Sequence, residues 1–86
     1  MLIKTTGEVL EISPKNGKDF KLKELQEYVG GNIECVRTHD NKMLIANETG
    51  KNDGLPYNEK ATKEYRYGGY DLIVGDVVIC NPAMVK

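Results

Sequence analysis

The apolar residues of this chain fall in short runs separated by turn-forming residues, and this pattern limits what the chain can fold into. The longest run is Val77–Cys80, far short of the about 20 apolar residues that a membrane-spanning helix needs. A chain of 86 residues suffices for one domain with a modest core. We therefore predict a single domain over residues 1–86, built from short strands and short helices, with no segment in a membrane.

Strand-turn-strand patterns predict a mainly antiparallel sheet. Gly7 lies between two strand-like runs, where a tight turn needs a permissive backbone. A second pair of runs flanks the polar turn residues around Asp40. We predict an α+β fold with five or six strands. The strand-like runs are residues 2–5, 8–12, 33–37, 43–46, 70–74 and 77–80.

Helical spacing of apolar residues predicts one helix packed on this sheet and a second, shorter helix. The first covers residues 21–29, with Asp19 as its N-cap and glycines at its end. Its predicted apolar face consists of Leu22, Leu25 and Val29. Asn58 is the predicted N-cap of the second helix, Glu59–Tyr65.

The two cysteines lie in apolar, strand-like segments, so we predict that Cys35 and Cys80 are small buried hydrophobic residues. A disulfide or a reactive thiol is the alternative. The single histidine, His39, lies in a predicted hairpin turn. One His and no closely spaced Cys pair leave too few ligands for a structural zinc site. We identify no catalytic constellation and expect no enzyme activity, no cofactor and no metal.

The charge balance argues against a protein that works by neutralising many phosphates. The chain has 12 basic and 13 acidic residues, for a net charge of −1. Nucleic-acid binding needs a cluster of basic side chains on one face. We therefore rank nucleic-acid binding low.

Two segments carry the residue types that are most common at binding surfaces. Residues 65–70 contain three of the five tyrosines, and Tyr and Arg are enriched at binding hot spots. Residues 47–58 form the longest irregular stretch, and loops of this length are often functional. The candidate contact surface consists of Lys51, Tyr57, Asn58, Tyr65, Arg66, Tyr67 and Tyr70.

Four segments also carry a family resemblance: LQEYVGGNIE (residues 25–34), NETGK (47–51), LPYN followed by AT (within 55–62) and DLIVG (71–75). In order and spacing, this set resembles a family of small phage, plasmid and gut-bacterial proteins described only as a domain of unknown function. The resemblance implies a mobile-element setting and assigns no activity to any residue. Small proteins in that setting often counter host defence.

These observations lead to three hypotheses. The first is a cytoplasmic, non-enzymatic protein that inhibits a host protein by direct contact. The second is a sponge that binds a nucleotide signal, with Lys51, Tyr57, Asn58 and Arg66 as ligands. The third is a nucleic-acid binder. A half-exposed sheet edge also favours a homodimer.

Overall fold

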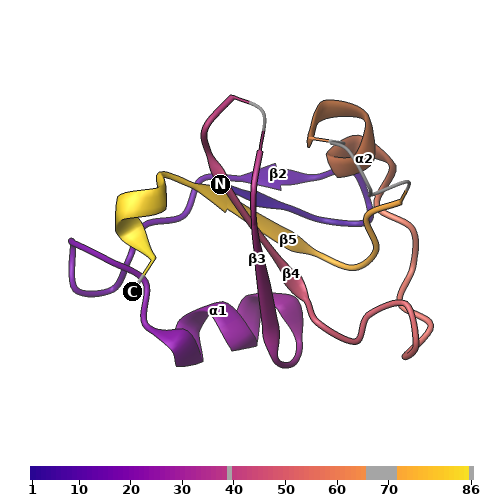
Figure 1. The fold of residues 1–86 in the computed structure, drawn as a ribbon, viewed down its shortest axis with the longest axis horizontal. Helices are drawn as coiled ribbons and strands as arrows, with labels where there is room; N and C mark the ends of the chain where they lie inside the picture. The colour runs from indigo at the N-terminus through magenta and orange to yellow at the C-terminus, as the bar shows by residue number, and fades with distance from the viewer. Residues whose placement is uncertain (39, 66–71, 86) are drawn as a thin grey trace.

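The computed structural model describes residues 1–38, 40–65 and 72–85, and over these residues it shows one five-stranded sheet (Figure 1). The strands are β1 (Leu2–Ile3), β2 (Val9–Leu10), β3 (Ile33–Arg37), β4 (Met43–Asn47) and β5 (Val77–Cys80). All strand pairs are antiparallel, in the order β2-β1-β5-β4-β3. The predicted α+β class and both predicted hairpins are confirmed.

The sixth predicted strand, residues 70–74, is not formed in its described part. Only Val74 makes an isolated bridge, with Tyr57. Residues 70 and 71 lie outside the described residues.

The last strand, β5, lies at the centre of the sheet between β1 and β4. Val78 is aligned with Leu2 on one side and with Ile45 on the other. All residues of β5 are buried. The two ends of the chain are therefore joined in the middle of the sheet, and the fold closes only when β5 is in place.

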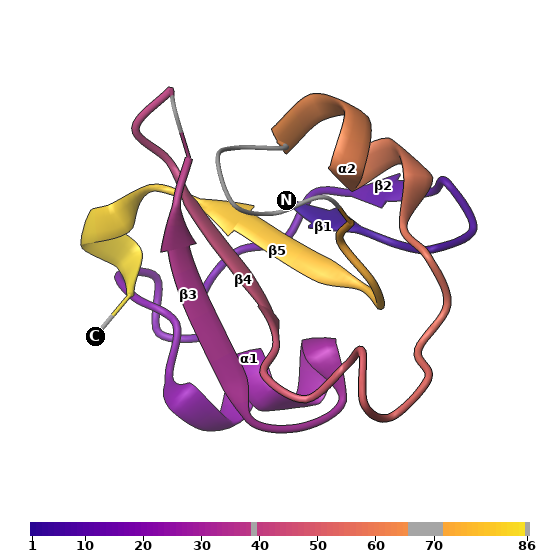
Figure 2. The same cartoon turned by 45° about the vertical axis from the view of Figure 1, so that its right-hand side comes forward.

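Each face of the sheet is covered by a different helix, α1 (Leu22–Val29) or α2 (Glu59–Tyr65), and Figure 2 shows these helices on opposite sides. Side chains alternate between the two faces along each strand. The core cluster on the α1 side consists of Leu2, Phe20, Leu25, Val29, Ile45, Val78 and Cys80. The cluster on the α2 side consists of Ile3, Leu44, Ala61, Ile73, Val77 and Ile79.

Helix α1 begins differently from the prediction, because its N-cap is Lys21 and not Asp19. The Asp19 carboxylate instead accepts a hydrogen bond from Asn16 Nδ2 at 3.1 Å, in the preceding turn. The backbone N–H groups of Lys21 and Lys15 donate to the Glu24 carboxylate at 3.0 and 3.1 Å. These two donors hold the pKa of Glu24 below its ordinary value.

The apolar face of α1 also differs from the prediction at its first residue. Leu22 is 58% exposed, whereas Leu25 and Val29 are buried as predicted. Phe20, before the helix, is buried in the core and meets Tyr28 edge to face with ring centroids 6.5 Å apart. Gly30, with φ of 80°, ends the helix as predicted. Among the described residues, no helix is long and apolar enough to cross a membrane.

We predict that Glu24→Gln lowers the melting temperature at neutral pH, because the amide loses the charge that strengthens both hydrogen bonds. The folded-state pKa of Glu24 is lowered, so its contribution is present above the ordinary glutamate pKa and is lost as pH falls through the folded value. Thermal unfolding from pH 7 to pH 3 should therefore show the two melting temperatures converging. Glu27→Gln, an exposed change on the same helix, is the control; an equal effect in both variants would contradict the prediction.

Candidate functional site

The segment between β4 and α2 is irregular, as predicted, but its own hydrogen bonds give it one defined shape. Asn47 anchors its start: Nδ2 donates to Val29 O at 3.2 Å, and Oδ1 accepts from Thr49 N at 2.9 Å. Further along, Leu55 N donates to Gly50 O at 3.0 Å. The loop is therefore closed on itself and tied to the end of α1.

The Leu55 side chain fixes the far end of this loop against two glycines. A Cβ atom at Gly75 would lie 2.9 Å from Leu55 Cδ1, and one at Gly50 would lie 3.2 Å from it. Gly75 also has φ of 76°, a conformation that other residues rarely adopt. Leu55 thus packs closely against the backbone of both glycines, and at Gly75 the positive φ also favours glycine.

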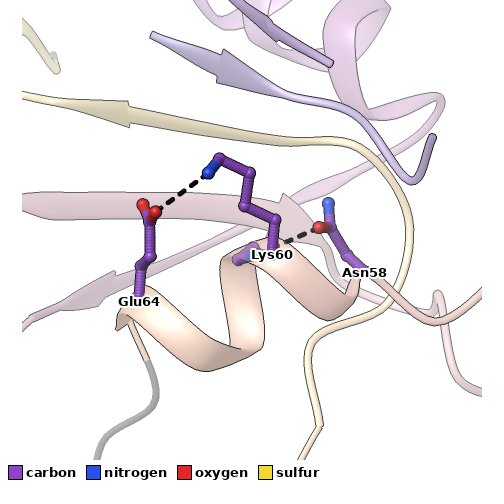
Figure 3. A network of polar contacts seen from close by, with 4 residues as sticks. Asn58, Lys60 and Glu64 are labelled. Carbon is purple, nitrogen blue, oxygen red and sulfur yellow. Dashed lines mark hydrogen bonds and ion pairs between the residues drawn. The ribbon is translucent and has the colours of Figure 1, made fainter. Parts of the chain in front are cut away.

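Asn58 is the most constrained polar residue at the site, because it is fully buried. Its Oδ1 accepts from Ala61 N at 3.0 Å and caps α2 as predicted; Figure 3 shows this contact beside the Lys60–Glu64 ion pair. Its Nδ2 donates to Ile3 O at 2.9 Å and to Gly75 O at 2.8 Å. One side chain therefore joins β1, α2 and the segment before β5.

The segment before β5 is held at several further points. Asn58 N donates to Ile73 O at 2.8 Å, and Ile73 N donates to Thr62 Oγ1 at 2.9 Å. Gly75 N donates to Pro56 O at 2.7 Å. Because both backbone groups of Ile73 are satisfied by the α2 region, Leu72 and Val74 on either side of it are held in fixed positions.

A cavity of about 410 Å³ opens between this segment, the loop and the α2-side face of the sheet. Its described lining includes two acidic residues, Glu34 and Glu48, and one basic residue, Lys51. The other lining residues are Leu44, Ala46, Asn47, Thr49, Asn52, Leu72, Ile73 and Val74. The cavity is therefore mixed in polarity, with an excess of acidic over basic groups among the described residues.

The structure separates the predicted contact residues into three groups. Lys51 is exposed and lines the cavity. Tyr57 is 44% exposed, and its backbone forms a bridge with Val74, which lines the cavity. Asn58 has no exposed surface, which corrects its prediction as a contact residue. Tyr65 is the last residue of α2. Arg66, Tyr67 and Tyr70 lie outside the described residues.

Sequence reasoning missed two residues that line the cavity, Glu34 and Leu72. Glu34 comes from β3, and the alternation of that strand already placed it on the face opposite Cys35. Leu72 is 47% exposed and lines the cavity. We call the surface formed by Lys51, Asn52, Tyr57 and Leu72 the loop face.

Cys35 is exposed, so the prediction of a buried thiol is wrong for this residue and right for Cys80. The reason is strand order: β3 is an edge strand, and the α1-side core is centred on β4 and β5. Both cysteines are free thiols. Loss of hydration raises the pKa of each above the ordinary value. Both thiols are therefore protonated at neutral pH, and a protonated thiol is a weak nucleophile.

Metal binding finds no support in the described part of the chain. No group of three or more His, Cys, Asp or Glu side chains lies close enough there to hold an ion.

We predict that Asn58→Ala destabilises the protein by about 3 kcal/mol, because two buried carbonyl groups lose their donor and α2 loses its cap. Asn58→Asp, which keeps the cap but places a carboxylate against the two carbonyls, should be as damaging. Asn52→Ala, an exposed change in the loop, should leave stability unchanged. Urea unfolding measures all three; equal stability of the Asn58→Ala and Asn52→Ala variants would contradict the assignment.

Comparison with known proteins identifies a family and no activity. The model of one family, described as a domain of unknown function (DUF3846), matches residues 1–84. Neither a curated protein nor a solved structure matches the chain. The family match covers nearly all of the sequence and agrees with the resemblance noted above. This chain therefore belongs to the DUF3846 family.

Proposed function

We propose that this chain is a non-enzymatic binding protein that acts by direct contact with another protein through the loop face. The observation that carries the proposal is the pair of exposed apolar side chains, Tyr57 and Leu72, at 44% and 47% exposure. Both are attached to backbone that is fixed by the hydrogen bonds around Asn58 and Ile73.

Rigid presentation matters because binding loses less entropy when the contact residues are already ordered. Aromatic side chains that are backed by well-packed structure are the usual anchors of protein interfaces. Lys51 and Asn52 lie at the rim of the cavity and supply the polar border that such interfaces have. The loop face therefore combines apolar anchors, a hollow and a polar rim.

A nucleotide sponge is the second candidate, and the cavity volume favours it. About 410 Å³ falls within the size range of small-molecule sites. In its described lining, however, the two carboxylates of Glu34 and Glu48 outnumber the one base, Lys51. This excess of negative charge repels phosphate. Asn58, one of the expected ligands, is buried and fully hydrogen-bonded. We therefore rank protein binding first.

More narrowly, we propose that this chain comes from a mobile element and that the protein it binds is a cytoplasmic protein of the host cell. The support for this narrower proposal is the family resemblance of the sequence. The charge balance of the whole chain continues to argue against nucleic acid as the partner.

We predict that Tyr57→Ala weakens binding to a partner protein about 30-fold, the loss expected for a hot-spot aromatic. The partner is captured from lysate of the source cells with the wild-type protein, then purified and titrated by calorimetry. The matched control is Val9→Ser with Leu10→Ser, which alters exposed apolar residues of β2 at the far edge of the sheet. Equal binding by the Tyr57→Ala variant and the wild type would contradict the proposal.

A thermal-shift screen against common nucleotides and cyclic dinucleotides separates the two candidates. We predict no change in melting temperature with any of them, because a ligand stabilises a protein only if it binds the folded state. A rise of several degrees that is lost in Lys51→Ala would overturn protein binding in favour of the sponge.

A further inference from the structure

The open edge of the sheet at β3 has a backbone pattern that fits a second copy of this chain. Among the described residues, β3 is hydrogen-bonded to β4 alone and lies at one end of the strand order (Figure 2). It is five residues long, whereas β2 at the other edge has two. The β3 edge is therefore the longer pairing surface.

The backbone groups that point away from β4 follow from two hydrogen bonds that flank the strand pair. Glu48 N donates to Asn32 O, and Thr38 N donates to Lys42 O, each at 2.8 Å. Hydrogen-bonded and non-hydrogen-bonded pairs alternate in an antiparallel ladder. The even-numbered residues of β3 therefore bond to β4. The odd-numbered residues, Ile33, Cys35 and Arg37, direct their N–H and C=O groups outward.

This edge lacks several of the features that usually prevent strand addition. Exposed edges are commonly blocked by charged side chains, especially Lys, by Pro or by a β-bulge. The sequence of β3 is Ile-Glu-Cys-Val-Arg, with no Lys and no Pro, and its register with β4 runs through all five residues without a bulge. The charged residues of the strand are Glu34 and Arg37. No strand in the described part of the chain pairs with this edge, so its outward backbone groups are available for strand addition.

We propose that two copies of this chain pair through β3 in antiparallel orientation, with Cys35 opposite Cys35 of the second copy. Only outward-pointing residues can bond across such an interface. When the register is centred on Cys35, Ile33 of each copy lies opposite Arg37 of the other. This register gives three hydrogen-bonded pairs, with about six hydrogen bonds in all. Shifting the register of the two β3 strands by two residues in either direction leaves only two hydrogen-bonded pairs. One of these shifts also places Glu34 opposite Glu34 of the second copy, and like charges in opposed positions are destabilising.

The two-fold axis of this dimer runs perpendicular to the sheet, so equivalent faces lie on the same side. Both α1 helices then lie on one side and both cavities on the other. Glu34, which lines the cavity, lies across from Val36 of the second copy, so each cavity borders the interface. The dimer presents two loop faces together. This inference concerns assembly and does not depend on the proposed function.

The test is analytical ultracentrifugation of the full chain over the micromolar range, with two changes at one position. Cys35→Pro removes an outward N–H group and leaves the bonds to β4 intact, whereas Cys35→Ser keeps the N–H group. We expect a dimer for the wild type and for Cys35→Ser, and a monomer for Cys35→Pro. A monomeric wild type, or a Cys35→Pro variant that still forms dimers, would overturn the proposal.

A cross-linking measurement keeps the test decisive if Cys35→Pro fails to fold. Opposed residues of a hydrogen-bonded pair have Cα atoms about 5.5 Å apart, so a short bis-maleimide should join two copies through Cys35. The covalent dimer should form in the wild type and in Cys80→Ser, and disappear in Cys35→Ser. Cross-linking no faster than that of a monomeric protein with one exposed thiol would contradict the proposed register.

Discussion

The side chain of Asn58 is the contact on which the rest of the α2-side face depends. It joins an N-terminal strand, the start of α2 and the turn before β5, three segments that are far apart in the sequence. Buried backbone carbonyls need donors, and here one amide supplies two of them. Without it, the loop face would lose the contact that ties its attachment directly to β1.

This dependence follows from the small size of the elements on that face. Helix α2 has seven residues, too few to be stable in isolation. Among its described side chains, the buried Ala61 and Thr62 connect it to the core, together with the Asn58 cap. Thr62 in turn holds the backbone of Ile73. The rigidity that places Leu72 and Tyr57 at the surface therefore comes from a polar network together with a small apolar cluster.

The sequence predicted those features that depend on neighbouring residues. Helix α1, the hairpin of β3 and β4 and the capping role of Asn58 all follow from local spacing and turn chemistry. Strand order depends on contacts between distant segments, so the exposure of Cys35 on an edge strand could not be predicted. For the same reason, only the structure shows the hydrogen bonds that the Asn58 side chain donates to Ile3 O and Gly75 O. The position of Glu34 at the cavity likewise appears only in the structure.

Native-state hydrogen exchange can show whether the loop face is a rigid extension of the core. The decisive amides are those of Asn58, Ile73 and Gly75, which donate within the network, and Ile79 in the buried strand β5 is the reference. We predict that all four amides exchange with the same free energy of opening, that of global unfolding. Exchange of the three network amides orders of magnitude faster than that of Ile79 would contradict it.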